Sequence, residues 1–423
     1  MGGEGYIDLK YEPSRDDLVC EFRVEPAAGV GLRKAAEAVA GESSIGTWTD
    51  VSTSKPYVKK LGARVFEVHG NYIKVAYPIG LFEPDNIPQI LSSVAGNIFG
   101  MKIVKNLRLE DINLPDMVMK SFEGPQFGIS GVRKLLGVSK RPLVGTIIKP
   151  KLGLRTADHA KVAKDAWVGG CDIVKDDENL SSQGFNPFRK RVVQTLKARD
   201  MAAADSGEAK VYMSNITAET NEMLERARFV KEQGGEYVMI DIMTTGWSAL
   251  QTLRKADLGL VIHAHRAMHA ALTRGPKHGI SMLVVVKLAR LIGVDQIHIG
   301  TIIGKMVGAK ADIVEIEQQI EQSIIQPHKE THALGEEWMH IKPVFAVCSG
   351  GLHPGHVPKL VEMLGKDIII QAGGGCHGHP KGTKEGATSL RQAVNATINN
   401  ISLREYAKNH RELKAALDKW AVK

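Results

Sequence analysis

The stretch DIVKDDENL, residues 172–180, ends an apolar segment with one lysine and three carboxylates. If the apolar residues form a strand, alternation places Lys175 and Asp177 on one face, with Glu178 at the turn. Asp176 is then directed away from them. Carboxylate oxygens are ligands that Mg²⁺ prefers, so the segment predicts a magnesium site, although the ammonium group of Lys175 would repel a cation. A solvated run of charges has the same composition, and the stretch alone leaves both interpretations open.

Two further segments carry groups that can bind anions or transfer protons. Lys149 and Lys151 in GTIIKPKLGL are two residues apart, which places them on the same side of a strand. They predict phosphate binding and an amine base, with a pair of surface lysines as the alternative. His265 and Arg266 in HAHRAMH, together with His298 in IHIGT, predict proton transfer beside an anion clamp. A single histidine would more simply be a satisfied core residue.

Three glycine-containing segments are typical of loops that approach phosphate. GTIIGKMVGAK carries Lys305 between glycines that would let it swing over a substrate, with a flexible exposed loop as the alternative. CSGG and QAGGG follow two later apolar segments, and their backbone amides can approach a phosphate without side-chain obstruction. Together these groups predict a substrate with a phosphate at each end, chelated by Mg²⁺ through its middle oxygens. Metal-stabilised enolisation is the expected first step.

Eight apolar segments must position these groups. They alternate with helical patterns, which predicts a closed (β/α)₈ TIM barrel over residues 127–423. Barrel enzymes carry their active groups at the carboxyl ends of the strands, where this chain has its polar residues. The expected strands are 143–150, 171–178, 209–217, 237–243, 260–267, 296–301, 342–351 and 367–375, and residues 403–423 are expected to form one amphipathic terminal helix.

The first 126 residues follow a different pattern, in which strand-like segments outnumber helical ones. The order predicts a smaller α+β domain of ferredoxin-like, split βαβ character in front of the barrel. The expected strands are 6–13, 17–26, 63–70, 72–78 and 104–114, and the expected helices are 32–40 and 88–100.

Composition limits the function classes. The chain has 423 residues, of which 43% are hydrophobic and 24% charged, which is ordinary globular composition. No apolar run reaches the roughly 18 residues of a membrane helix, and the N-terminus is unlike a signal peptide. The net charge of +8 is mixed along the chain with acidic residues, and the four cysteines are scattered. We expect a cytoplasmic protein that binds neither membranes nor nucleic acid.

The motifs taken in order closely resemble the large chain of ribulose-1,5-bisphosphate carboxylase/oxygenase (RuBisCO), archaeal form III type. The resemblance runs nearly end to end through GESSIGTW, AGNIFGMK, GTIIKPKLGL, GGCDIVKDDENL, HAHRAMHA, IHIGTIIGK, SGGLHPG and QAGGG. It implies that activating CO₂ converts Lys175 into a carbamate. This carbamate would bind one Mg²⁺ per active site together with Asp177 and Glu178. Lys149 would remove the substrate C3 proton, and His265 would be a second proton-transfer residue.

The same resemblance implies further contacts. Lys305 would steady the carboxylated intermediate. The implied substrate-binding residues of the barrel are Lys151, Arg266, His298, Ser349, Gly350, Gly351, Gln371, Ala372, Gly373 and Gly374. Those implied for the N-terminal domain, where they would complete the active site of a neighbouring subunit, are Glu42, Thr47, Trp48 and Asn97.

The implied reaction is carboxylation of D-ribulose 1,5-bisphosphate to two molecules of 3-phosphoglycerate, with O₂ as a competing substrate, in AMP or nucleoside ribose salvage. The implied assembly is a homodimer with shared active sites, or a larger oligomer of such dimers, without a small subunit. Two alternatives stand beside it. One is a RuBisCO-like enolase or isomerase acting on another phosphorylated sugar, and the other is a non-catalytic barrel that serves as a binding protein.

Overall fold

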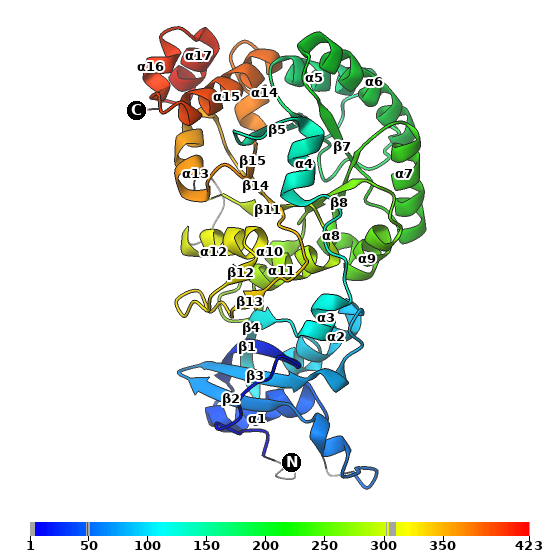
Figure 1. Ribbon diagram of the computed structural model, residues 1–423, viewed down its shortest axis with the longest axis vertical. Coiled ribbons are helices and arrows are strands. Elements are labelled where there is room, and N and C mark those ends of the chain that lie inside the picture. Colours follow the sequence, from blue (N-terminus) through cyan, green and yellow to red (C-terminus); the bar gives the residue numbers. More distant parts are fainter. Residues whose placement is uncertain (1–4, 48, 50, 302, 304–309, 423) are drawn as a thin grey trace. The chain divides into compact units, whose positions relative to one another are not determined.

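The computed structural model describes residues 5–47, 49, 51–301, 303 and 310–422 (Figure 1). Contacts divide the chain into two compact units, and the first takes in two segments from the second half of the chain. The first unit comprises Met1–Gly124, Met268–Ile292 and Gln322–Ile341, and the second comprises Pro125–Ala267, Gly293–Glu321 and Lys342–Lys423. The domain boundary expected at residue 126 stays a prediction, because contacts do not test which segments fold independently.

The second unit contains a closed barrel of eight strands, each paired in parallel with its neighbours, which confirms the predicted TIM barrel. All eight expected segments form strands. Their cyclic order is β5 (Leu143–Ile147), β6 (Ile173–Lys175), β7 (Val211–Asn215), β8 (Tyr237–Asp241), β9 (Val261–His265), β11 (Gln296–Gly300), β14 (Phe345–Ser349) and β15 (Ile368–Gln371).

Apolar side chains fill the amino-terminal end of this barrel. Leu143, Ile173 and Val261 lie at or near the first positions of their strands and are fully buried in one cluster. Helix α4 (Gly128–Leu136) contributes Val132 and Leu136 to the same cluster. Because this end is packed with apolar residues, polar side chains can gather only at the opposite, carboxyl ends of the strands.

Helices surround the barrel in the second unit (Figure 1). The expected single terminal helix is wrong, because the chain leaves helical geometry at His410, whose φ is −131°, and forms two short helices instead. The helices are α5 (Thr156–Val168), α6 (Phe188–Ser206), α7 (Thr220–Glu232), α8 (Ile242–Thr245), α9 (Trp247–Lys255), α12 (Lys310–Glu321), η4 (Pro354–His356), α13 (Val357–Leu364), α14 (Gly374–His377), α15 (Thr383–Ile398), α16 (Leu403–Ala407) and α17 (Arg411–Lys419).

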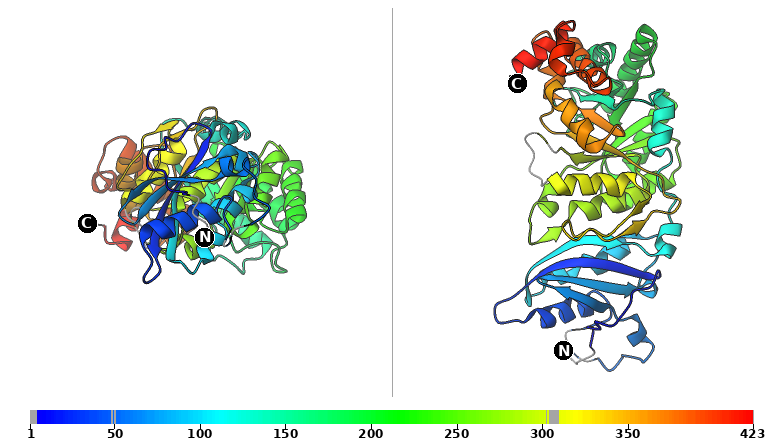
Figure 2. Two further views of the ribbon diagram at one scale, coloured as in Figure 1. Left: turned by 90° about the horizontal axis from the view of Figure 1, so that it is seen from below. Right: turned by 60° about the vertical axis from the view of Figure 1, so that its left-hand side comes forward.

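The first unit is built on a five-stranded sheet in the order β10-β4-β1-β3-β2. Helix α1 packs against this sheet (Figure 2). Its strands are β1 (Asp17–Pro26), β2 (Arg64–His69), β3 (Tyr72–Pro78), β4 (Val104–Asn113) and β10 (Gly279–Ile280), and β12 (Ile324–Ile325) pairs separately with β13 (Glu336–Glu337). Its helices are α1 (Leu32–Glu42), η1 (Val58–Leu61), η2 (Ile79–Leu81), α2 (Ile87–Val94), η3 (Asn97–Gly100), α3 (Asp116–Lys120), α10 (His269–Thr273) and α11 (Met282–Ile292).

Two expected elements of this unit are wrong. The strand expected at 6–13 is reduced to a single bridge between Ile7 and Val65, because the chain turns at Asp8, which accepts hydrogen bonds from the amides of Lys10 and Tyr11. The helix expected at 88–100 is interrupted at Gly96. A Cβ at that position would lie 2.0 Å from the carbonyl oxygen of Ser92, so the close approach requires glycine.

A buried ion cluster joins three distant segments of the first unit. Lys287 on α11 lies 3.1 Å from Asp111 on β4 and 3.2 Å from Glu336 on β13, and all three side chains are nearly or fully buried. Burial raises the pKa of Asp111 to about 6 and that of Glu336 to about 7, although Lys287 opposes both shifts. The native state therefore binds more protons than the unfolded chain between about pH 4 and pH 7.

We expect Lys287→Met to lower the free energy of unfolding by about 3–5 kcal/mol at pH 8, because two buried carboxylates lose their cation. Near pH 5 the loss should be smaller, since Asp111 and Glu336 can then protonate. Urea denaturation at both pH values measures the difference. Lys120→Met, which removes an exposed pair with Asp116, is the control and should change the free energy by less than about 1 kcal/mol. Equal losses at the two pH values would contradict this account.

No helix among the described residues is long and apolar enough to span a membrane.

Candidate active site

Polar residues gather at the carboxyl ends of the barrel strands, as the sequence predicts. Lys175 is the last residue of β6, and Asp177 and Glu178 follow it after Asp176. His265 is the last residue of β9 and Ser349 the last residue of β14. Parallel strands in a closed barrel bring these ends to the same rim, so the residues share one site.

Ion pairs connect the lysines with the two proposed metal ligands. The Nζ atom of Lys149 donates to Asp177 Oδ2 at 2.7 Å. Lys175 is fully buried, its Nζ lies 3.5 Å from Glu178 Oε2, and it donates to the carbonyl oxygen of Asp176 at 2.8 Å. The Nε2 atom of His265 lies 3.6 Å from the same Glu178 oxygen. β6 ends at Lys175, so Asp177 lies beyond the strand and the two residues share no strand face, although their charges belong to one cluster.

Burial dominates the electrostatics of Lys175. Removal from water lowers the pKa of its amine, and the nearby Glu178 and Asp177 only partly oppose this effect. Burial alone would raise the pKa of Glu178, but the charges of Lys175 and His265 outweigh it and lower that pKa. The site therefore holds ionised carboxylates beside an amine that gives up its proton more readily than an exposed lysine.

The strand at Lys149 ends earlier than expected. β5 stops at Ile147, so Lys149 and Lys151 lie in the bend beyond it rather than on one strand face. Lys149 turns toward Asp177, whereas Lys151 is exposed. The alternation argument for these two lysines is therefore wrong, although both remain at the rim.

A row of histidines lies across β9 and β11. The Nδ1 atom of His298 lies 2.8 Å from Ser349 Oγ, and its Nε2 lies 2.9 Å from His263 Nε2. Burial lowers the pKa of both histidines well below the usual range, so both rings are neutral. The side-chain amide oxygen Oε1 of Gln296 faces His263 Nδ1 at 3.1 Å. Because the Gln296 oxygen can only accept, His263 carries its proton on Nδ1 and accepts at Nε2 from His298 Nε2. The Nδ1 atom of His298 is then unprotonated and accepts from the Ser349 hydroxyl.

The groups that the sequence predicts to bind anions lie around this row. Burial lowers the pKa of Arg266 to about 10, and no carboxylate among the described residues pairs with it. A Cβ on Gly300 would lie 2.8 Å from Arg266 Nη2, and a Cβ on Gly373 would lie 3.1 Å from Lys149 Cε. The arginine thus packs against the end of β11, and the glycine turn after β15 approaches the lysine of the charged cluster.

The other barrel glycines and their neighbours occupy the expected turns. Gly350 and Gly351 follow β14 with φ of +117° and +77°, a conformation that favours glycine. Gln371 ends β15 and is buried, and the carbonyl of Ala372 accepts from the Thr146 hydroxyl at 2.9 Å. Gly374 is exposed at the start of α14.

Not every predicted site residue is brought to this cluster. Glu42, Thr47 and Asn97 belong to the first compact unit and are exposed there. Trp48 and Lys305 lie outside the described residues.

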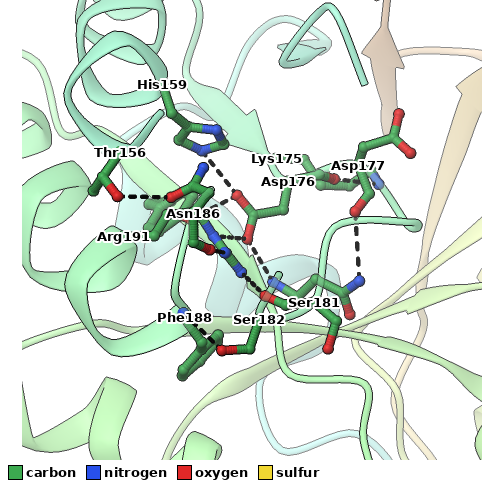
Figure 3. Close-up of polar contacts among 12 residues, drawn as sticks. Thr156, His159, Lys175, Asp176, Asp177, Ser181, Ser182, Asn186, Phe188 and Arg191 are labelled. Atoms are coloured by element: carbon green, nitrogen blue, oxygen red, sulfur yellow. Dashed lines mark hydrogen bonds and ion pairs between the residues drawn. The ribbon is translucent and has the colours of Figure 1, made fainter. Parts of the chain in front are cut away.

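The sequence reasoning missed one carboxylate of the rim, and it directed a second, Asp176, away from the rim without identifying its partners. Asp241 at the end of β8 lies 2.6 Å from His265 Nδ1, and its position at an apolar strand end was a usable signal. Asp176 is fully buried among Arg191, Tyr212 and His159 on the other side of β6 (Figure 3). Burial would raise the pKa of Asp176, but Arg191 and its hydrogen-bond donors hold it well below the usual range. The contacts of Asp176 come from distant segments, so no local sequence pattern predicts them.

The donor set can be tested against the implied metal. Among the described residues, no group of three or more histidine, cysteine, aspartate or glutamate side chains is arranged to hold an ion. Asp177 and Glu178 supply two carboxylates, and the third neighbour is the buried Lys175 amine. A carbamate on that amine would add the missing anionic oxygens, so the residues fit Mg²⁺ together with activating CO₂.

A closed parallel barrel with lysines, carboxylates and histidines at its strand ends defines a (β/α)₈-barrel enzyme. The family described as ribulose bisphosphate carboxylase large chain matches over nearly the whole chain, its catalytic domain at residues 128–420 and its N-terminal domain at residues 5–118. The chain belongs to this family and is an enzyme with ribulose-bisphosphate carboxylase activity.

Relatives and solved structures agree with this assignment. Ribulose bisphosphate carboxylase of Methanosarcina mazei is 52% identical over 99% of this chain and 99% of that protein. The enzyme of the same name from Methanocaldococcus jannaschii is 50% identical over 98% of this chain and 99% of that protein. The dimeric archaeal Rubisco from Hyperthermus butylicus has a TM-score of 0.94 at 44% identity, covering 99% of both chains. The octameric enzyme of Pyrococcus horikoshii has a TM-score of 0.92 at 48% identity, covering 99% of this chain and 96% of that one.

Proposed function

We propose that the chain catalyses Mg²⁺-dependent enolisation and carboxylation of D-ribulose 1,5-bisphosphate to two molecules of 3-phosphoglycerate, with oxygenation by O₂ as a side reaction. The observation that carries this proposal is the fully buried Lys175 amine, 3.5 Å from Glu178 and two residues from the buried Asp177. Neither a surface run of charges nor a binding scaffold accounts for a lysine buried at that position.

Carbamate formation follows from the state of this amine. The ammonium group first loses one proton. The neutral amine then attacks the carbon of CO₂, a nitrogen–carbon bond forms, and a second proton leaves the nitrogen. The side chain thereby changes from a cation to an anion, and the lowered pKa of Lys175 makes the neutral form more accessible. Lys175, Asp177 and Glu178 would then hold the metal, and Mg²⁺ would supply positive charge next to the substrate oxygens.

The remaining residues move protons and hold phosphates. Lys149 removes the C3 proton, and His265, held by Asp241 at 2.6 Å, serves a second proton transfer. His298 and Arg266 hold one phosphate, and the remaining contacts to substrate come from Lys151, Ser349, Gly350, Gly351, Gln371, Ala372, Gly373 and Gly374. Lys305 closes over the substrate and steadies the carboxylated intermediate.

The proposed assembly is a homodimer in which Glu42, Thr47, Trp48 and Asn97 complete the active site of the neighbouring subunit. Larger oligomers of such dimers form without a small subunit. The dimeric Hyperthermus butylicus and octameric Pyrococcus horikoshii enzymes support the formation of a homo-oligomer. The proposed supply of substrate from AMP or nucleoside ribose rests on the archaeal kinship alone.

We expect purified protein incubated anaerobically with Mg²⁺, labelled bicarbonate and ribulose 1,5-bisphosphate to place acid-stable label in 3-phosphoglycerate. Proton exchange at C3 without label would instead indicate a RuBisCO-like enolase. Absence of both label and exchange, together with no binding of the substrate, would favour the non-catalytic scaffold.

A further inference from the structure

Asp176 lies between Lys175 and Asp177 but takes no part in the charged cluster at the barrel rim. Its side chain is fully buried on the other side of β6, and both carboxylate oxygens are engaged (Figure 3). Oδ1 accepts from the Tyr212 hydroxyl at 2.6 Å and lies 3.0 Å from His159 Nε2. Oδ2 accepts from Arg191 Nε at 3.1 Å and from the backbone amide of Asn215 at 3.0 Å. We call Asp176, Tyr212, Arg191 and His159 the Asp176 clamp.

The clamp fixes the backbone that carries the proposed metal ligands. The amide of Asp176 donates to Met213 on β7 at 3.0 Å, and its carbonyl oxygen accepts from Lys175 Nζ at 2.8 Å. The backbone amide and the backbone carbonyl of Asp176 are thus both hydrogen-bonded, and the side chain of the same residue is held by the clamp. A shift of Asp176 would carry this carbonyl acceptor, and with it the amine, to a new position.

Arg191 extends the clamp to the loop that follows. Besides Asp176, it donates to the carbonyl oxygen of Ser181 at 2.7 Å and to that of Asn186 at 2.8 Å. Asn215, next to the clamp, donates its side-chain amide to the carbonyl oxygen of Glu178 at 3.0 Å. The charges of Asp176 and Arg191 compensate each other, so the clamp holds the segment without adding net charge behind the site.

We propose that Asp176, held by Tyr212 and Arg191, is a positioning residue that sets how readily Lys175 is carbamylated and the metal is bound. This inference rests on the proposed carbamate function of Lys175. Groups that orient metal ligands from behind commonly change metal affinity by about 10–100-fold when they are removed. The clamp touches no proposed phosphate contact, so its effect should fall on activation and spare substrate binding.

Tyr212→Phe tests the proposal, because it removes only the hydroxyl that donates to Asp176. Tyr237→Phe is the matched control. Tyr237 is a fully buried tyrosine on the adjacent strand β8, and its hydroxyl has no hydrogen-bond partner among the described residues. Arg191→Lys is a second variant, which keeps the charge but cannot reach three acceptors at once.

Activation, meaning carbamate formation and metal binding, is measured without enzyme turnover. The carbamate is followed by ¹³C NMR with ¹³CO₂ and Mg²⁺, and metal binding by the EPR signal of Mn²⁺ used in place of Mg²⁺. We expect Tyr212→Phe to need about tenfold more CO₂ and metal for half-saturation, with Arg191→Lys changed in the same direction and Tyr237→Phe unchanged. The KM for ribulose 1,5-bisphosphate, measured after full activation, should stay within about twofold of the parent value in all three.

Three other outcomes would overturn the positioning role of Asp176. If the parent protein forms a carbamate and Tyr212→Phe activates like Tyr237→Phe, the positioning role is overturned while the proposed function stands. An equal change in activation and in KM would also overturn it, because that indicates general loosening of the barrel. If the parent protein forms no carbamate, the proposed function and this inference fail together.

Discussion

Replacing Lys175 with alanine is expected to lower the carboxylation rate by at least about 10³-fold, without loss of the fold. Among the described residues Lys175 is the buried amine beside both proposed carboxylate ligands, so its removal leaves two anionic side chains and no site for the activating CO₂. Asp177 keeps its partner Lys149 and Glu178 keeps its neighbour His265, so the rim should stay ordered. Labelled bicarbonate measures the turnover, and the ¹³C carbamate signal should disappear.

Controls separate this effect from misfolding. Lys175→Met fills more of the buried space and should be equally inactive, whereas Lys161→Ala removes a lysine that is exposed on α5 and should be fully active. Thermal melting should show folded protein in all three. Substantial turnover in Lys175→Ala would falsify the carbamate role.

The pH dependence of the parent protein follows from the same amine. Carbamylation needs the neutral form, so activation should increase as the pH rises. Because burial lowers the pKa of Lys175, the midpoint of this increase should lie below the value of about 10.4 for a free lysine. A midpoint at or above that value would contradict the proposed environment.

Lys149→Met is expected to reduce turnover by a similar factor, about 10³-fold, but at a different step. The variant keeps Lys175, Asp177 and Glu178, so carbamate formation and metal binding should persist. It lacks the amine that we propose removes the C3 proton, so exchange of that proton with solvent should stop as well. Carbamate NMR and tritium exchange at C3 measure the two steps separately.

The contacts of Lys149 explain how its amine could act as the base that removes the C3 proton. Its Nζ atom is bonded to Asp177 at 2.7 Å, and its side chain is about one-third exposed, at 37%, so it can also reach a substrate at the rim. A metal held by Asp177 would compete with Lys149 for this carboxylate, which would leave the amine available as a base. Lys161→Met is the matched control. Retained C3 exchange in Lys149→Met would assign the base to another residue, with His265 as the first candidate.

The sequence by itself determined the barrel and most of its rim. Eight near-continuous apolar segments can be buried on both faces only as parallel strands covered by helices, so the fold follows from local composition. Each of these strands ends where polar residues begin, and barrel geometry brings such ends together. Lys175, Asp177, Glu178, His265 and His298 could therefore be placed at one site before any contact was known.

Tertiary structure alone decided how these residues are held. The donors that surround Asp176 come from α5, α6 and β7, and the partners of Lys287 come from β4 and β13. No spacing in the sequence joins such distant segments, because the contacts arise only when the chain is closed. The turn at Asp8 and the break at Gly96 have a different cause, because a few local hydrogen bonds and one close approach there outweighed an apolar pattern. Patterns of composition predict which face of an element is buried, whereas the partner of a buried charge depends on the packing of the whole unit.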